Sequence, residues 1–341
     1  MVLAAGAGTR LRPLTYETPK PMVPVVNRPV LHHVLDNLQR HGVAETVINL
    51  HTRPELIRRY CSDGSRWGMK IRYSREADLL GTAGAVKKME KVFRDCAFFV
   101  LSGDGLSDIH LTDLLHFHKT RKALATIVLK PMDHRFDYGV VLTKANRQVR
   151  KFVEKPSWSE VFSNEVNTGI YLLEPEVLRY IPKNRPYDFG NELWPALVKK
   201  GLPIYGYTMS GYWCDVGNLS EYRKSQWDAL DGKIQIRIPG REIREKIWVD
   251  ERTRIPPKVR LKAPCVIGQG AILHPNCVIG PYTVVGDFSE IGSGAVLKNC
   301  ILWNRVRVGR NVHLSNCIIG ENGSVQEDIS VYEAAVLNIR Q

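Results

Sequence analysis

The second half of the chain carries a strict six-residue repeat, which constrains the fold more than any other feature of the sequence. A branched aliphatic residue occupies every sixth position from residue 249, and the spacing drops by one residue before 302 and again before 319. Because a period of six matches neither an α-helix nor a single strand, it predicts short strands stacked in coils. Such a coil is stable only as a stack, since each rung buries its inward aliphatic side chain against its neighbours. The repeat positions are Val249, Ile255, Leu261, Ile267, Leu273, Ile279, Val285, Ile291, Leu297, Leu302, Val308, Leu314, Ile319 and Val325.

Small side chains occupy most positions two residues before these aliphatic residues, and four of them are Cys265, Cys277, Cys300 and Cys317. We interpret these cysteines as packed thiols rather than a metal site, because buried cysteine behaves as a small apolar residue. Cys300 and Cys317 are 17 residues apart, which places them on adjacent coils.

The first half of the chain has a different pattern, in which short β-rich runs alternate with amphipathic segments. This alternation predicts an α/β domain with a mostly parallel central sheet, whose ligands bind beyond the carboxyl ends of the strands. We therefore divide the chain into an α/β domain over 1–232, a linker over 233–248 and a repeat domain over 249–341. The predicted strands are 47–50, 70–73, 97–101, 125–129, 139–143 and 168–173, and the predicted helices are 30–41, 82–92 and 111–122.

Composition narrows the choice of partners and compartment. Lysine and arginine total 48 against 35 acidic residues, a surplus of 13 that attracts polyanions such as nucleic acid, anionic lipid or phosphorylated metabolites. No apolar run approaches the ~18 residues of a membrane span, and residues 1–5 are too short for a signal-peptide core. The seven cysteines form no CxxC pair and no zinc-site spacing. These observations predict a cytoplasmic protein with no membrane partner.

The most informative segment is the glycine-rich loop over 3–15, followed by Pro-Lys-Pro-Met at 19–22. The loop is not a Walker A loop, because no Gly-Lys-Ser/Thr closes it, and Leu11 stands where a dinucleotide fingerprint needs its third glycine. A strand that runs into Gly-Ala-Gly-Thr exposes backbone N–H groups that can cradle phosphate oxygens. Arg10, Arg12 and Lys20 add three cations. The alternative is a flexible basic surface turn.

This loop resembles the hallmark of the nucleotide-sugar pyrophosphorylases, enzymes that join a nucleoside triphosphate to a sugar 1-phosphate. Further matching segments are 80–84, 102–104, 152–156, 167–171 and 213–217. The resemblance implies a Rossmann-like α/β nucleotidyltransferase domain with a mixed or parallel sheet, followed by a left-handed parallel β-helix. We also predict a homo-oligomer formed through the β-helix domain, because an open coil end leaves strand edges that must be covered.

The implied reaction is attack of a sugar 1-phosphate oxygen on the α-phosphorus, with release of pyrophosphate. Both reactants are anionic, so catalysis consists chiefly of positioning and charge neutralisation. The resemblance assigns Mg²⁺ to Asp104 and Asp215, the α- and β-phosphates to Arg10, and the charge that develops at the α-phosphorus to Lys20. The remaining implied nucleotide-binding residues are Leu3, Ala4, Ala5, Gly6, Gly8, Thr9, Glu76, Gly81, Thr82 and Ala83, together with Asp104.

On the sugar side, the resemblance assigns the sugar phosphate to Lys155. The candidates for the sugar hydroxyls are Gly139, Glu154, Asn167 and Thr168. Part of the positive surplus is explained by binding of two phosphorylated ligands, without any nucleic acid. The residues that would bind them are Arg10, Arg12, Lys20 and Lys155. The basic stretch over 237–260 remains unexplained.

The base-contacting segment over 76–84 resembles that of mannose-1-phosphate guanylyltransferases, which implies GDP-mannose synthesis from GTP and mannose 1-phosphate. Glu76 either accepts hydrogen bonds from guanine or positions the loop. The alternative substrates are UTP, dTTP or ATP with glucose 1-phosphate. A second alternative is a non-catalytic regulatory subunit, although such relatives typically lose residues equivalent to Arg10, Lys20, Asp104 or Asp215. His274 and His313 lie on the repeat and are interpreted as surface histidines rather than acyltransfer residues.

Overall fold

The computed structural model describes residues 1–132, 138–157 and 161–337. Spatial contacts divide the chain into two compact units. The first comprises Met1–Ala7, Pro19–Pro21 and Leu31–Asp215, and the second comprises Gly8–Thr18, Met22–Val30 and Val216–Gln341. This division follows contacts, whereas the boundaries at 232 and 248 follow sequence character and stay a prediction.

The first unit is built on a nine-stranded mixed sheet with the order β10-β9-β11-β6-β1-β4-β5, to which β8 and β12 are added through β11. Strands β5, β4, β1 and β6 run parallel, whereas β11 is antiparallel to β6, β8 and β9. The sheet is therefore mixed, as the predicted fold class allows, rather than mostly parallel. The bounds are β1 Val2–Leu3, β4 Glu45–Leu50, β5 Lys70–Arg75, β6 Phe98–Ser102, β8 Ala125–Pro131, β9 Val140–Thr143, β10 Val149–Val153, β11 Glu165–Leu173 and β12 Ile204–Thr208.

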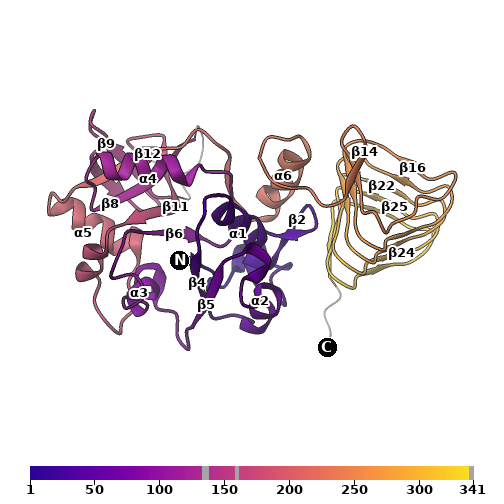
Figure 1. The fold of residues 1–341 in the computed structure, drawn as a ribbon. Helices are drawn as coiled ribbons and strands as arrows, with labels where there is room; N and C mark the ends of the chain where they lie inside the picture. Colours follow the sequence, from indigo (N-terminus) through magenta and orange to yellow (C-terminus); the bar gives the residue numbers. More distant parts are fainter. Residues whose placement is uncertain (133–137, 158–160, 338–341) are drawn as a thin grey trace. The chain divides into compact units, whose positions relative to one another are not determined.

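Helices surround this sheet, as Figure 1 shows for α1 to α5. In α1, the buried residues Leu31, Val34, Leu35 and Leu38 recur at helical spacing and form one apolar face. All six predicted strands correspond to strands of the sheet. The helix predicted over 82–92 is observed as α3, which ends four residues earlier, at Lys88. The helices are α1 Val30–Arg40, α2 Pro54–Cys61, α3 Gly81–Lys88, α4 Leu111–Thr120 and α5 Trp194–Lys199, with short helices η2 Lys20–Met22, η3 Ser65–Trp67, η5 Pro175–Tyr180 and η6 Phe189–Leu193.

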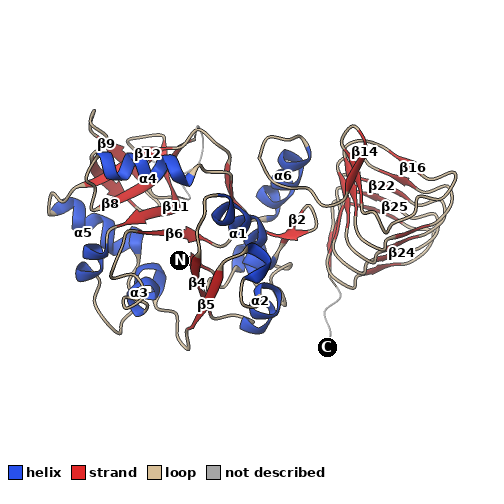
Figure 2. Ribbon diagram, viewed as in Figure 1, coloured by secondary structure: helices blue, strands red, loops and turns tan. Residues whose placement is uncertain are grey.

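The second unit contains the repeat region, which forms three sheets of parallel strands, as predicted, except that β14 pairs antiparallel with β15. Figure 2 shows its short strands stacked one above another and joined by loops. Ile267 lies opposite Val285, 18 residues or three repeats later, and Val285 lies opposite Leu302, 17 residues later, where the spacing drops by one. The sheets are β14 Arg241–Arg244, β15 Ile247–Val249, β17 Cys265–Ile267, β20 Thr283–Val285, β23 Ile301–Leu302, β26 Ile318–Ile319 and β29 Ala335–Val336; β16 Arg260–Leu261, β19 Val278–Ile279, β22 Val296–Lys298, β25 His313–Ser315 and β28 Ser330–Tyr332; β18 Ile272–Leu273, β21 Glu290–Ile291, β24 Arg307–Val308 and β27 Ser324–Val325.

Burial in the repeat region follows the six-residue pattern. Every predicted inward aliphatic is buried except Ile255, which is partly buried against the same core. The backbone N–H of Ile301 donates to the carbonyl oxygen of Cys317 at 2.9 Å, so Cys300 and Cys317 lie on adjacent coils as predicted. None of the seven cysteines forms a disulfide in the described part of the chain, and the four in the small-residue column are buried.

The same unit includes helix α6 Leu219–Leu230, the short helix η1 Thr9–Leu11, and the hairpin strands β2 Pro24–Val25 and β3 Arg28–Pro29. Tyr222 and Gln226 of α6 donate hydrogen bonds to the carbonyl oxygen of Pro24, and Trp303 of the repeat region donates to the Tyr222 hydroxyl at 2.9 Å. Helix α6 therefore joins the hairpin to the repeat coils. Among the described residues, no helix combines the length and apolar character needed to cross a bilayer.

The repeat core provides a matched test of stability. Ile279 is fully buried, whereas Ile272, which lies on another sheet beside the inward repeat residue Leu273, is 55% exposed. We expect Ile279→Ala to lower the free energy of unfolding of this unit by about 2–5 kcal/mol, because it removes buried methyl groups and leaves a cavity. Ile272→Ala should change it by no more than about 0.5 kcal/mol. Urea unfolding followed by circular dichroism measures both, and equal effects would contradict the inward orientation of the repeat.

Candidate functional site

Two aspartates that are far apart in the sequence meet at the carboxyl end of the central strand β6. Asp104 follows β6 directly, two residues after Ser102. Strand β13 (Trp213–Asp215) pairs antiparallel with β7 (Gly105–Ser107), and this register places Asp215 opposite Gly105. The two-stranded pairing therefore brings Asp215 beside Asp104.

Lys20 connects the two carboxylates. Its Nζ lies 2.6 Å from Asp104 Oδ2 and 2.8 Å from Asp215 Oδ1, and the residue is only 8% exposed. Ser102 Oγ donates a hydrogen bond to Asp104 Oδ1, the carboxylate oxygen that does not contact Lys20. Three predicted site residues thus form one cluster, which we call the Lys20–Asp104–Asp215 cluster.

The charges in this cluster stabilise one another. Burial alone would lower the pKa of Lys20, but the attraction and hydrogen bonds of Asp104 and Asp215 outweigh it and raise the pKa of the lysine above its ordinary value. Burial alone would raise the pKa of Asp104, and the attraction and hydrogen bond of Lys20 outweigh it and lower that pKa. The lysine therefore stays cationic and Asp104 anionic at neutral pH.

The residues after β1 lie against the loop that carries Asp104. The Gly103 N–H donates to the Leu3 carbonyl oxygen at 2.8 Å, and the Ala4 N–H donates to Asn49 Oδ1 at 2.7 Å. The start of the glycine-rich loop is thus held by the ends of two neighbouring strands. The structure places Leu3, Ala4, Ala5 and Gly6 in the same compact unit as the Lys20–Asp104–Asp215 cluster.

The next part of the glycine-rich loop belongs to the second compact unit, with Thr9 and Arg10 in helix η1. This part is closed by a hydrogen bond from Thr15 Oγ1 to the Gly8 carbonyl oxygen at 2.7 Å. The predicted roles of Gly8, Thr9 and Arg10 stay predictions.

Glu76 holds the predicted base-contacting segment in place. Its Oε1 accepts from Asn49 Nδ2 at 2.7 Å, its Oε2 accepts from the Leu80 N–H at 3.0 Å, and the residue is 3% exposed. Because Asn49 also accepts from Ala4, these hydrogen bonds connect the glycine-rich loop to the residues that begin helix α3. Of the two alternatives for Glu76, this geometry favours positioning of the loop.

Helix α3 itself begins with Gly81, Thr82 and Ala83, which are fixed by the segment before helix η6. The N–H groups of Ala83 and Gly84 donate to the Tyr187 carbonyl oxygen at 3.0 and 2.9 Å. Thr82 Oγ1 donates to Asp188 Oδ2 at 2.7 Å, and Asp188 caps η6 by accepting from two backbone N–H groups. Sequence reasoning missed Asp188 and Asn49. The sequence features that could have identified them are an acid at a helix N-cap for Asp188 and an amide near the end of a strand for Asn49.

Among the predicted sugar-side residues, Glu154 is enclosed by two glycines. A Cβ built at Gly139 would lie 2.7 Å from Glu154 Oε2, and one built at Gly190 would also contact this carboxylate. Burial and the nearby Asp188 raise the pKa of Glu154, and Lys155 opposes this shift. Lys155 itself is exposed, and the Asn167 N–H donates to the Gly139 carbonyl oxygen at 2.7 Å. Gly139, Glu154, Lys155 and Asn167 therefore lie near one another.

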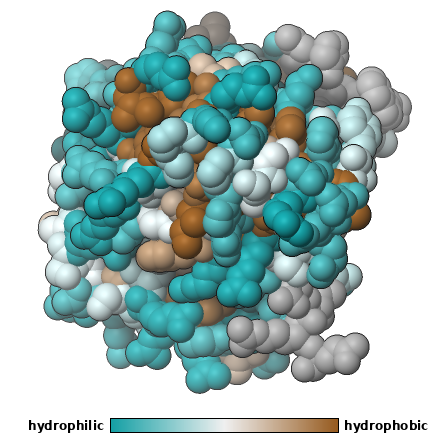
Figure 3. All heavy atoms as spheres, turned by 90° about the vertical axis from the view of Figure 1, so that its right-hand side faces the viewer, coloured by the Kyte–Doolittle hydropathy of each residue, from teal (hydrophilic) through white to brown (hydrophobic). Residues whose placement is uncertain are grey.

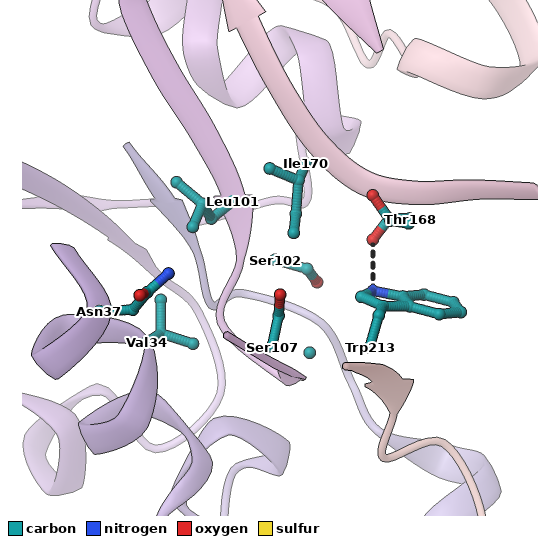
Figure 4. A pocket seen from close by; sticks show the side chains of 9 residues that line it. Val34, Asn37, Leu101, Ser102, Ser107, Thr168, Ile170 and Trp213 are labelled. Atoms are coloured by element: carbon teal, nitrogen blue, oxygen red, sulfur yellow. Dashed lines mark hydrogen bonds between the residues drawn. The ribbon is translucent and has the colours of Figure 1, made fainter. Parts of the chain in front are cut away.

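Thr168 is buried within strand β11 of the central sheet. Its hydroxyl donates to the Val128 carbonyl oxygen at 2.8 Å. Its own carbonyl oxygen accepts from Trp213 Nε1 at 3.1 Å, as Figure 4 shows. Ser102, Ser107 and Ile170 line the same cavity, whose volume of about 10 Å³ suits one water molecule rather than a nucleotide. Through Trp213, Thr168 holds the strand that ends at Asp215.

The donor chemistry at the cluster suits a hard divalent cation. Two carboxylates converge, and Mg²⁺ is commonly held by one or two carboxylates with substrate oxygens and water. In the described part of the chain, no three or more histidine, cysteine, aspartate or glutamate side chains gather as a metal cage would require. Asp104 and Asp215 are thus the residues that could contribute to a shared protein–substrate metal site.

Comparison with protein families identifies both parts of the chain. The profile described as "Nucleotidyl transferase" matches residues 1–232, and the profile described as "GMPPB C-terminal domain" matches residues 261–339. The first match covers more than half of the chain and includes all the predicted site residues.

Curated relatives extend over nearly the whole chain. A protein named UTP--glucose-1-phosphate uridylyltransferase from Synechocystis sp. is 35% identical, over 91% of this chain and 88% of the relative. Mannose-1-phosphate guanylyltransferase 1 from Arabidopsis thaliana is 32% identical, over 99% of this chain and 90% of the relative. A crystal structure of a putative glucose-1-phosphate thymidylyltransferase from Bacillus anthracis matches with a TM-score of 0.61 at 23% identity, covering 69% of this chain and 95% of that one, and supports the fold.

The Lys20–Asp104–Asp215 cluster predicts a pH-dependent stability. Wild-type Asp104 contributes stability above its unfolded pKa and loses it as the pH falls through its lowered folded pKa. In Lys20→Met, the two carboxylates lose their counter-ion, so the pKa of Asp104 rises. Protonation of Asp104 then removes the electrostatic repulsion between the two carboxylates. We expect the variant to be less stable than wild type by about 3 kcal/mol at pH 7 and by less at pH 5.

Urea unfolding at both pH values measures this difference. Lys91→Met, at an exposed lysine, is the control and should change stability by no more than about 0.5 kcal/mol. A Lys20→Met deficit that is absent, or that is the same at pH 7 and pH 5, would contradict the assignment of the charges.

Proposed function

Since this chain belongs to the nucleotidyl transferase family, we propose that it transfers a nucleotidyl group from a nucleoside triphosphate to a sugar 1-phosphate and releases pyrophosphate. The observation that carries this proposal is the Lys20–Asp104–Asp215 cluster, a buried cation between two carboxylates at the carboxyl end of β6. Names of relatives over nearly the full chain support the same reaction class.

The chain's own residues would act by positioning and by charge. The attacking oxygen belongs to a phosphate that is already anionic near pH 7, so the reaction requires no general base. Lys20 would stabilise negative charge at the α-phosphorus, since its ammonium is held in one place by two ion pairs and needs no reorganisation. Backbone N–H groups over 3–9 would bind phosphate oxygens, and Arg10 would contact the α- and β-phosphates through its planar guanidinium.

We propose Mg²⁺ as the cofactor, held by Asp104 and Asp215 together with phosphate oxygens of the substrates. Bound there, it would neutralise phosphate charge. The support is the donor set, since the paired carboxylates already attract one cation, the Lys20 ammonium. Ser102 orients Asp104 by donating to its second oxygen.

The sugar phosphate would bind at Lys155 and the sugar hydroxyls at Glu154, Asn167 and Gly139. The two glycines around Glu154 leave its carboxylate close to the backbone, where any side chain would displace it. The Thr168 hydroxyl is committed to Val128, so we propose that Thr168 supports the site through Trp213.

For the substrate pair, we propose GTP and mannose 1-phosphate, which would make GDP-mannose. The support is the segment over 76–84 and the guanylyltransferase relatives. UTP with glucose 1-phosphate is the second candidate, favoured by the Synechocystis relative at 35% identity and by the engagement of both Glu76 oxygens within the chain. A regulatory subunit without activity is less well supported, because Lys20, Asp104 and Asp215 are all present and in contact.

We further propose a cytoplasmic homo-oligomer with small-molecule substrates and without nucleic-acid or membrane partners. The seven cysteines, none of which forms a disulfide in the described part of the chain, suit a reducing compartment. The repeat coils end in strand edges that a second copy can cover.

Pyrophosphate release tests the proposed reaction. The assay combines GTP, UTP, dTTP or ATP with mannose 1-phosphate or glucose 1-phosphate, with and without Mg²⁺. We expect the highest kcat/KM for GTP with mannose 1-phosphate, and only in the presence of Mg²⁺. A higher value for UTP with glucose 1-phosphate would favour the second candidate. No release from any pair would contradict the transferase proposal and favour the regulatory role.

A further inference from the structure

Lys20 is joined on both sides to segments that belong to the unit with the repeat coils. Of residues 8–30, the first compact unit contains only Pro19–Pro21, whereas Gly8–Thr18 and Met22–Val30 belong to the second unit. The ion pairs of Lys20 with the two aspartates fix the end of its side chain. The position of its backbone depends also on the two flanking segments, and therefore on what holds them.

The segment after Lys20 is a short hairpin with a strained turn. Strands β2 and β3 pair antiparallel and are joined by Val26 and Asn27, whose φ angles are 42° and 64°. Positive φ at both central residues is typical of a type I′ turn, which favours asparagine and glycine, and it is an outlier for a β-branched residue such as valine. Val26 is also fully buried. Such a conformation persists only where the surrounding contacts impose it.

The contacts that impose this turn come from helix α6 and from a repeat coil. The Val26 N–H donates to Gln226 Oε1 at 2.8 Å, and Asn27 Nδ2 donates to the Val285 carbonyl oxygen at 2.8 Å. Val285 is one of the inward aliphatic residues of the repeat and lies on strand β20. The tip of the hairpin is therefore bonded directly to a repeat coil.

A second set of hydrogen bonds holds the beginning of the hairpin, at Pro24. Its carbonyl oxygen accepts from the Tyr222 hydroxyl at 2.8 Å and from Gln226 Nε2 at 2.7 Å. Trp303 of the repeat region donates to the same hydroxyl at 2.9 Å, and Tyr222 is fully buried. Buried polar networks whose members are bonded to one another specify a single arrangement. The second unit thus fixes the hairpin at two places, the nearer of them four residues after Lys20.

The exposed apolar residues of the repeat region give a weaker guide to its role than these internal contacts. Figure 3 shows one face of the molecule, on which hydrophobic surface is broken up by hydrophilic side chains. Several exposed large apolar residues of the repeat region, Ile272, Phe288 and Ile329, lie on separate coils. Single exposed apolar side chains are normal on a protein surface and do not indicate a docking face.

We propose that the repeat unit positions Lys20 for catalysis through this hairpin, and that Asn27 is the positioning residue that joins the two. The inference rests on the proposed transfer reaction, in which Lys20 stabilises the charge that develops at the α-phosphorus. Displacement of such a group by about 1 Å costs about a hundredfold in rate. The two ion pairs hold the ammonium, and the hairpin holds the backbone from which the side chain extends. The β-helix thus takes part in the reaction, although we assign none of its residues to a substrate.

Asn27→Gly tests this role. Glycine adopts the positive φ of the turn without strain, and the substitution removes the side chain that donates to Val285. We expect kcat for pyrophosphate release to fall by about tenfold, because Lys20 acts on charge in the transition state. KM for the sugar 1-phosphate should stay within about twofold of wild type, because its proposed contacts all lie in the first unit. Steady-state kinetics with the preferred substrate pair measures both values.

Asn276→Gly is the matched control. Asn276 also has a positive φ, of 65°, and it is exposed in the repeat region, so its kcat should stay within about twofold of wild type. Trp303→Phe is a second variant, which keeps an aromatic ring and removes the donor to Tyr222, and its kcat should fall by about threefold. Unchanged kcat in Asn27→Gly, or an equal loss in Asn276→Gly, would overturn the proposal. If Asn27→Gly does not fold, unchanged kcat in Trp303→Phe would overturn it.

Hydrogen exchange provides a readout that does not depend on the reaction. Mass spectrometry of the protein without substrates measures the exchange of backbone N–H groups in the peptide that contains Lys20. We expect this peptide to exchange about threefold faster or more in Asn27→Gly, and at the wild-type rate in Asn276→Gly. An unchanged rate in Asn27→Gly would overturn the positioning of Lys20 by the hairpin. Absence of pyrophosphate release from every protein would count against the proposed reaction, and the exchange rates alone would then decide whether the hairpin holds Lys20.

Discussion

The ion pairs of Lys20 with Asp104 and Asp215 are the interaction on which the candidate site depends. They connect a residue near the amino terminus with the loop after β6 and the end of β13. Removing such charges from water costs several kcal/mol per ion, so a buried pair is poor evidence of stability by itself. The more direct consequence of these ion pairs is that they fix positions. The ammonium and both carboxylates are held where strand β6 of the central sheet ends.

Hydrogen bonds extend this order outward from the cluster. Asn49 and Glu76 link the glycine-rich loop to the start of α3, and Asp188 links α3 to the segment beside Glu154. The predicted base-contacting and sugar-contacting residues are thus parts of one internal framework. A change in Asn49 or Asp188 would act through other residues, which makes both positioning residues.

Sequence reasoning succeeded where the signal is local and periodic. The six-residue repeat identified the inward side chains of the β-helix because each coil repeats the same contact, and the β-rich runs located the strands of the first sheet. The direction of the strands could not be predicted in the same way. The antiparallel pairing of β11 depends on contacts between residues that are far apart in the sequence. Lys20, Asp104 and Asp215 were each predicted as site residues, but the ion pairs between the lysine and the two aspartates were not, because they form only when three distant segments meet. Strand β14 lies within the predicted linker. It was not predicted, because the basic composition of this segment does not resemble that of a strand.

Binding of Mn²⁺, as a spectroscopic substitute for Mg²⁺, tests the central claim most directly. Electron paramagnetic resonance measures the free ion during titration of the protein with a nucleoside triphosphate and no sugar 1-phosphate. The account predicts that wild type and the exposed-site control Asp95→Asn bind the ion alike, and that Asp104→Asn and Asp215→Asn each weaken binding by about tenfold or more. Equal Mn²⁺ affinity in all four proteins would contradict a metal site at the Lys20–Asp104–Asp215 cluster.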